Sequence, residues 1–454
     1  MRLSRHCERS EAIHGRAGWI ASSLALIAMT FGGASPALAQ SEPPPVDVEV
    51  TSGGVNSAIT IAVPAMPVDG ADLALGRNIA GVIASGLRSS GRFSPLGPAG
   101  LPNYSIAQAD APAFGEWRGL GANQLVTGFV RATGPGQITV GCYLYDVGAG
   151  RELVRQGYQV TADNWRRAAN KCADAIYSRL TGEGGFLDTR VVFVAETGPK
   201  TNRQKRIAIM DSDGSNLRYL TEGEATVVTP RFSPDGSRLA YVSYQGRRAR
   251  VWVLDIASGQ KRLLVPGLAL TSAPRFSPDG NRIAYALSAN GNTDIWIANA
   301  DGSGAPRQLT SAPGIDTAPS FSPDGRRIVF ESDRGGSQQL YVMDADGSNQ
   351  RRISFGGPAG SPAWSPRGDK IAFVRVGAFR IGVMNAGGGS EQTLTDGWQD
   401  ESPSWAPNGQ FVMFNRFTRD GRSSLFAVPV GGGTARRLPT PQDGSDPSWS
   451  PLQR

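Results

Sequence analysis

The sequence is almost without histidine, and this absence excludes whole classes of active site. Its 454 residues include two histidines, His6 and His14, both close to the N-terminus. Beyond them no Ser-His-Asp or Cys-His catalytic set and no histidine-ligated metal site can form. The chain also lacks a Gly-x-Ser-x-Gly elbow and a Gly-x-x-x-x-Gly-Lys phosphate loop. We therefore expect no enzyme, no cofactor and no bound metal.

Long apolar runs are scarce too, and the one near the N-terminus predicts export. Gly18 to Phe31 is an apolar stretch of 14 residues that follows four arginines and precedes Ala37-Leu38-Ala39. This order is typical of a signal peptide, residues 1–39, cleaved after Ala39. The stretch is too short for a permanent membrane span. We expect an exported protein with no membrane span after cleavage.

The charge balance is mild. Beyond residue 39 the chain has 42 basic and 37 acidic residues, a net charge near +5. Spread over more than 400 residues, this excess is no footprint for nucleic acid. We expect no nucleic-acid partner.

A repeated phrase fixes the architecture of the C-terminal part. Pro-x-aromatic-Ser-Pro-Asp-Gly, exact or loosened, recurs six times, with aromatic residues spaced by 44, 45, 43, 41 and 44 residues. Self-similarity at this period is typical of a β-propeller, in which each repeat is one four-stranded blade. The aromatic residues are Phe232, Phe276, Phe321, Trp364, Trp405 and Trp449.

The ends of the repeat region predict how the ring closes. The strand-like run at Arg190 has no motif before it, and the motif at Trp449 has no strands after it. The sequence Ser448-Trp449-Ser450 should therefore supply the innermost strand of the blade that starts at Arg190. We expect six blades over residues 187–454, with no free sheet edge.

Residues 40–186 predict a different unit, a small α/β domain. Helical periodicity appears over Ala71–Leu87 and Asn164–Thr181, and strand patterns over 59–63, 125–130 and 137–145. The segment Gly182–Asp188 then leads into the propeller. The domain begins with a proline-rich arm, residues 41–51, that ends in alternating Val46, Val48 and Val50.

Two cysteines remain beyond the signal peptide. Cys142 lies on the apolar face of a predicted strand, and Cys172 lies on the apolar face of a predicted helix. Both point into one small core in an oxidising compartment. A disulfide between them and two separate buried thiols are both compatible with this pattern.

These features together resemble the TolB family of periplasmic propeller proteins in the Tol–Pal envelope system. The stretch Ala173-Asp-Ala-Ile-Tyr-Ser-Arg-Leu-Thr-Gly182, the small α/β domain, the signal peptide and the six repeats carry the resemblance. Asn170 departs from the family pattern, in which we expect histidine. The resemblance implies a non-enzymatic adaptor that binds Pal through the propeller and TolA through its N-terminal arm, with other envelope proteins as further candidate partners. Such an adaptor supports outer-membrane integrity and envelope constriction during cell division.

Two alternatives belong to other classes. Propellers with this repeat also serve as gating domains of peptidases, but such an enzyme needs a hydrolase domain that we do not find in the sequence. A carbohydrate- or solute-binding periplasmic propeller is the second alternative.

The segments before the six motifs predict the Pal site, and the arm predicts the TolA site through Val46, Val48 and Val50. Each segment joins an outer strand to the next innermost strand and so reaches the mouth of the central channel. The segments differ from blade to blade and mix apolar with acidic residues, which suits a partner with basic side chains. Ordinary solvated loops, and for the arm a plain edge strand, are the alternatives. The residues chosen for Pal are Val227, Leu270, Thr271, Asp316, Thr317, Asp400, Glu401 and Asp446.

Overall fold

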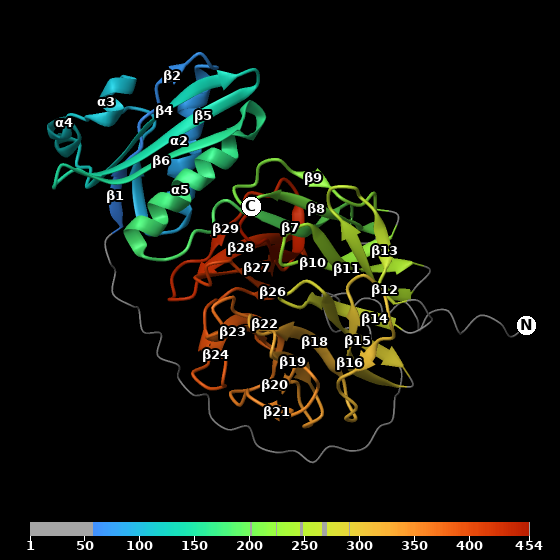
Figure 1. Cartoon of the computed structure of the whole chain (residues 1–454). Coiled ribbons are helices and arrows are strands. Elements are labelled where there is room, and N and C mark those ends of the chain that lie inside the picture. The colour runs from blue at the N-terminus through green and yellow to red at the C-terminus, as the bar shows by residue number, and fades with distance from the viewer. Residues whose placement is uncertain are drawn as a thin grey trace, which may run out of the picture.

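The computed structural model describes residues 58–199, 202–223, 225–245, 248–265, 270–289 and 291–453. The predicted signal peptide with its cleavage site at Ala39, and the arm with Val46, Val48 and Val50, lie outside these residues. The described chain forms a small α/β domain beside a six-bladed β-propeller (Figure 1).

The small domain is built on a mixed sheet of six strands in the order β3-β1-β4-β5-β6, with β2 paired to β4. Strand β1 is parallel to β3 and β4, whereas β4, β5 and β6 form an antiparallel meander. The strands are β1 (Ile59–Ala62), β2 (Val68–Asp69), β3 (Phe93–Leu96), β4 (Gln124–Gly134), β5 (Gln137–Asp146) and β6 (Arg151–Thr161).

Two long helices cover one face of this sheet and two short helices the other. The helices are α2 (Ala74–Ser89), α3 (Ile106–Asp110), α4 (Phe114–Gly119), the single 3₁₀ turn η1 (Ala162–Asn164) and α5 (Trp165–Thr181). The apolar stripes of α2 and α5 meet in one core with Val126, Val140 and Leu144 of the sheet. Trp117 of α4 packs in a second core on the opposite face, with Tyr143 and Tyr145.

A disulfide joins Cys142 of β5 to Cys172 of α5, with 5.8 Å between their Cα atoms. Both residues are fully buried in the helix-covered core. The bridge therefore ties the C-terminal helix of the small domain to the middle of its sheet.

Each blade of the propeller is an antiparallel sheet of four strands. Given from the innermost strand outward, the first three blades are β30 (Asp443–Trp449), β7 (Arg190–Thr197), β8 (Gln204–Asp211), β9 (Arg218–Tyr219); β10 (Thr226–Phe232), β11 (Arg238–Gln245), β12 (Arg248–Asp255), β13 (Lys261–Leu263); and β14 (Leu270–Phe276), β15 (Arg282–Ala289), β16 (Asn292–Asn299), β17 (Arg307–Gln308). The last three are β18 (Asp316–Phe321), β19 (Arg327–Ser332), β20 (Gln339–Asp344), β21 (Arg351–Arg352); β22 (Ala359–Trp364), β23 (Lys370–Arg375), β24 (Arg380–Asn385), β25 (Gln392–Thr393); and β26 (Gln399–Trp405), β27 (Phe411–Phe417), β28 (Ser423–Pro429), β29 (Arg436–Arg437).

The ring closes as the repeat count predicts. The C-terminal strand β30 pairs with β7 at the other end of the propeller, with Ser445 opposite Val194 and Trp449 opposite Val191. This pairing joins residues about 250 positions apart, so the first blade forms only when both ends of the propeller have met.

The repeated Ser-Pro-Asp-Gly phrase, exact or loosened, forms the hairpin turn between the innermost and second strands of five blades, whereas β30 reaches its partner β7 from the other end of the propeller. In the first motif the Ser233 N–H donates to the Arg238 carbonyl, and the Gly236 N–H donates to the Ser233 carbonyl. Gly236 has φ of 70°, a backbone conformation that favours glycine. The turn chemistry thus reverses the chain at the same motif position in these five blades.

The junction between the two domains is packed and hydrogen-bonded. Phe186 stacks on Phe411 with ring centroids 4.6 Å apart, and its edge meets Trp449 at 6.0 Å. The carboxylate of Asp174 accepts the N–H groups of Phe186, Leu187 and Asp188 at 2.7, 2.8 and 2.9 Å. The segment Gly182–Asp188, which leads into the propeller, is thus anchored to helix α5.

Candidate partner-binding site

One face of the ring carries the six segments that we predicted for Pal binding. We call it the crossing face, because the six loops that lead from an outer strand to the next innermost strand lie on it. These crossing loops are residues 220–225, 264–269, 309–315, 353–358, 394–398 and 438–442, some of which are only partly described. The hairpins between the second and third strands of each blade reach the same face.

The eight predicted residues belong to the innermost strands rather than to the loops. Val227, Thr271, Asp316 and Asp400 occupy the same position, three residues before the motif proline. All four are buried, and so are Thr317, Glu401 and Asp446. Leu270 is the one member of the eight with a large exposed fraction, 37 %. The expectation that carboxylates rim an apolar patch is therefore wrong for the four acidic residues, all of which are buried.

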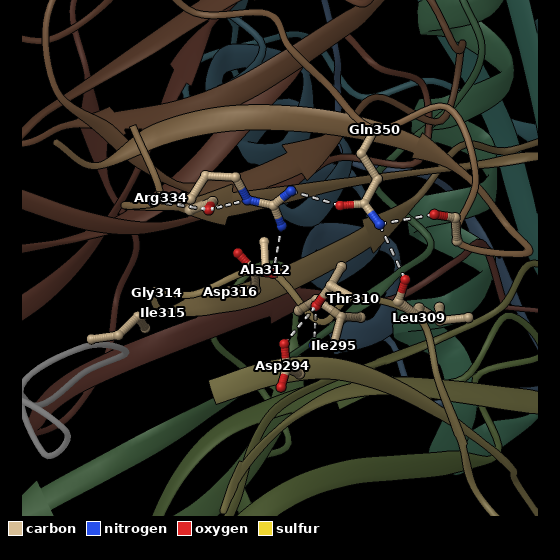
Figure 2. A network of polar contacts seen from close by, with 12 residues as sticks. Asp294, Ile295, Leu309, Thr310, Ala312, Gly314, Ile315, Asp316, Arg334 and Gln350 are labelled. Carbon is tan, nitrogen blue, oxygen red and sulfur yellow. Dashed lines mark hydrogen bonds and ion pairs between the residues drawn. The ribbon is translucent and has the colours of Figure 1, made fainter. Parts of the chain in front are cut away.

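Two of these acidic residues, Asp316 and Asp400, are buried because each forms an ion pair with an arginine of its own blade. Asp316 is fully buried and forms an ion pair with Arg334 at 2.6 Å. Figure 2 shows the Arg334 guanidinium between Asp316 and Gln350, whose amide oxygen it reaches at 2.7 Å. Asp400 repeats the arrangement, accepting two hydrogen bonds from Arg416 at 2.6 and 2.9 Å. Such pairs order the loops of the mouth but leave little negative charge for a partner.

Two other acids of the mouth are held by polar groups. The Asp446 carboxylate accepts the Thr229 N–H at 3.1 Å and the Ser402 hydroxyl at 2.7 Å. Glu401 accepts a hydrogen bond from the Gln399 amide at 2.7 Å. The Asp446 carboxylate thus links strand β30 to the innermost strands of both neighbouring blades, whereas the Glu401 hydrogen bond stays within β26.

Glu331 is an acid of a different kind. It is buried, with 1 % exposure, and it accepts the Ser361 N–H at 2.8 Å and the Gln338 amide. Among the residues that the structure describes, no lysine or arginine pairs with it. Burial raises the pKa of Glu331 to about 7, against the opposing effect of its hydrogen bonds.

The large apolar side chains with the highest exposed fractions on the crossing face are aromatic, and the sequence analysis did not predict them. Phe355 is 70 % exposed and Trp398 is 59 % exposed, and both lie in crossing loops. Arg352 lies over the Phe355 ring at 5.1 Å, and Arg419 lies over the Trp398 ring at 4.7 Å. The usable signal was a large aromatic residue within a crossing loop, outside the buried motif.

Taken together, the crossing face offers apolar side chains with cationic neighbours rather than a carboxylate rim. Large aromatic residues with a high exposed fraction are uncommon on monomers and are enriched at protein interfaces. The arrangement can bind a protein surface through apolar contact. In the described part of the chain no cluster of metal-ligating side chains occurs. That part also contains no helix long and apolar enough to cross a membrane.

Family models match both domains. The model of the TolB beta propeller domain matches residues 177–453, and that of the TolB amino-terminal domain matches residues 46–153. The chain belongs to the TolB family. A solved crystal structure of TolB from Acinetobacter baumannii superposes with a TM-score of 0.77 at 29 % identity, over 87 % of this chain and 97 % of that chain.

Curated relatives agree with the TolB family. The Tol-Pal system protein TolB of Rhizorhabdus wittichii is 53 % identical over 223 residues, 48 % of this chain and 49 % of the relative. The Tol-Pal system protein TolB of Sphingopyxis alaskensis is 54 % identical over 229 residues, 47 % of this chain and 50 % of the relative. The chain thus spans about half the length of the curated relatives it matches.

Proposed function

We propose that the chain is a non-enzymatic, periplasmic adaptor of the Tol–Pal system, which supports outer-membrane integrity and envelope constriction during division. It binds the lipoprotein Pal at the crossing face of the propeller. It binds TolA through the N-terminal arm, residues 41–51. The observation that carries the Pal assignment is the exposure of Phe355, Trp398 and Leu270 on one face of an otherwise closed ring.

The physical argument for a protein ligand rests on residue type. Aromatic side chains provide most of the energy in protein interfaces, and they do so when a partner removes them from water. The internal pairing of Asp316 and Asp400 argues against recognition by charge alone. The expected Pal surface is therefore apolar at its centre, in place of the basic one that the sequence suggested.

A binding measurement with matched variants tests the Pal assignment. The double substitution Phe355→Ala with Trp398→Ala should weaken Pal binding at least about tenfold by titration calorimetry. Leu73→Ala is the control, because Leu73 is 80 % exposed but belongs to the small domain. Pal affinity within about twofold of the unsubstituted protein in the double variant would place the site elsewhere.

A deletion tests the arm. A mature chain without residues 41–51 should lose TolA binding and keep its melting temperature, since the sequence of this segment has few core-forming residues. Pal binding by the same variant is the control for folding. Retained TolA binding would reject the assignment and favour the plain edge strand.

A further inference from the structure

The middle position of each Pro-x-aromatic motif faces the axis of the propeller. The six residues there form one layer around the channel, which we call the axial layer: Arg231, Arg275, Ser320, Ala363, Ser404 and Ser448. They line a cavity of about 230 Å³ that opens toward the Ser-Pro-Asp-Gly turns, on the face opposite the crossing loops. The aromatic motif residues Phe232, Phe276, Trp364, Trp405 and Trp449 line the same cavity.

A bulge in every innermost strand turns this position toward the axis. The residue before each motif proline has φ between 48° and 56°, a conformation that is rare for residues other than glycine. Strand pairing shifts register at the same place in all six blades. A bulge of this kind re-aims the side chains that follow it. The residues are Thr229, Ala273, Ala318, Ser361, Ser402 and Asp446.

The two arginines of the layer come from neighbouring blades and have no carboxylate partner among the described residues. Arg231 is 7 % exposed and donates only to main-chain carbonyls, those of Pro230 at 2.9 Å, Asp446 at 3.3 Å and Pro447 at 3.4 Å. Arg275 donates to the Pro274 carbonyl at 3.1 Å. The nearby Asp446 carboxylate is already occupied by Thr229 and Ser402.

The two positive charges therefore lie close together, and the Asp446 carboxylate offsets them only in part. Burial lowers the pKa of Arg231 to about 10. Burial, followed by the charge of Arg231, lowers the pKa of Arg275. Buried cations are ordinarily paired, because an unpaired charge is costly away from bulk water. Both arginines line the cavity on the axis.

Three serines complete the layer with hydroxyl groups. The Ser320 hydroxyl oxygen accepts the main-chain N–H of Trp364 at 3.0 Å. The Ser404 hydroxyl oxygen accepts the main-chain N–H of Trp449 at 2.9 Å. The Ser448 oxygen accepts the Phe232 N–H at 3.5 Å. Within the described chain none of the three hydroxyls donates a hydrogen bond to the protein. Each hydroxyl hydrogen is thus free to point at a ligand on the axis.

We propose that the axial layer is a binding site for a small tetrahedral oxyanion of the phosphate type, free or as a phosphate monoester. Guanidinium groups bind such anions through paired N–H donors. The donors surround the axis, with Arg275 and Ser404 on opposite sides of the ring, so an anion with oxygens in all directions uses more of them than a flat carboxylate. The aromatic residues around the opening leave room for a short organic group.

Calorimetric titration of the mature protein with inorganic phosphate, at constant ionic strength set by sodium chloride, tests the site. We expect one phosphate per chain, with glycerol phosphate binding comparably and acetate more weakly. Arg275→Gln should lower the affinity for phosphate at least about tenfold, as expected for the loss of a charge-assisted hydrogen bond. Arg351→Gln is the control, since it removes the same charge from an exposed outer strand.

Two further variants keep the proposal falsifiable if Arg275→Gln folds poorly. Arg275→Lys retains the charge but loses the planar fork, and Ser404→Ala removes one hydroxyl donor. Both variants should bind phosphate more weakly. Both should also show a smaller increase in melting temperature on phosphate addition. The proposal fails if phosphate binds no more tightly than acetate, or if the axial variants bind it as well as Arg351→Gln does. No partner protein takes part, so this result is independent of the proposed adaptor function.

Discussion

Individual ion pairs explain why the acidic residues predicted at the mouth of the propeller are buried in the structure. Asp316 and Asp400 look like surface acids in sequence, because each stands in a polar segment before a turn-rich motif. Their partners Arg334 and Arg416 lie 18 and 16 residues further along, in the next strand or hairpin of the same blade. Nothing in a linear pattern indicates that such pairs are buried.

Glu331 gives a prediction about pH at this scale. Its pKa rises from 4.5 to about 7 in the folded protein, so the folded state holds the proton more tightly than the unfolded state. The free energy of unfolding should therefore be highest below about pH 4.5 for this group and fall as the pH rises to about 7. The full loss is at most about 3 kcal/mol.

Urea denaturation between pH 5 and pH 8 checks this prediction. Both limits lie about one pH unit or more from the pKa of Glu331. Glu331→Gln should be more stable than the unsubstituted protein at the upper limit and should show a flatter pH dependence. Glu222→Gln, in an exposed position on a crossing loop, is the matched control. Parallel pH profiles for the two variants would contradict the assignment.

At the scale of elements, the repeat predicted most of the architecture. The Ser-Pro-Asp-Gly turn, the apolar runs and the unpaired motif at Trp449 indicated six blades and their closure, because turn chemistry and strand pairing are local properties. What could not be predicted was the exposure of each position. Phe355 and Trp398 differ from the buried motif aromatics only by lying in a crossing loop, and the bulge that turns Arg231 to the axis has no distinct sequence signal beyond its proline.

The disulfide gives the prediction at this scale. It closes a loop of 30 residues between β5 and α5, which corresponds to about 3–4 kcal/mol in the chain-entropy picture. Reduction should lower the melting temperature of the small domain, measured by scanning calorimetry. A variant with Cys142→Ala and Cys172→Ala should melt at the lower temperature and no longer respond to reductant. Equal melting with and without reductant in the unsubstituted protein would show that the bridge contributes nothing.

At the scale of the whole molecule, a closed ring presents two chemically different faces. The crossing face carries exposed aromatic residues with arginines over their rings. The opposite face carries the Ser-Pro-Asp-Gly turns and opens into the axial layer. The contact between Phe186 and Trp449 packs the segment that leads out of the small domain against the propeller. A partner that binds one face thus meets a rigid surface.

The central claim is that Pal binds the crossing face, and hydrogen exchange of the mature chain with and without Pal tests it most directly. The account predicts slower exchange on Pal addition in residues 353–358 and 394–402, the crossing loops and strand starts around Phe355 and Trp398. The turns around Gly236, on the opposite face, should exchange unchanged. Protection confined to those turns or to the small domain, with the crossing loops unaffected, would contradict the account.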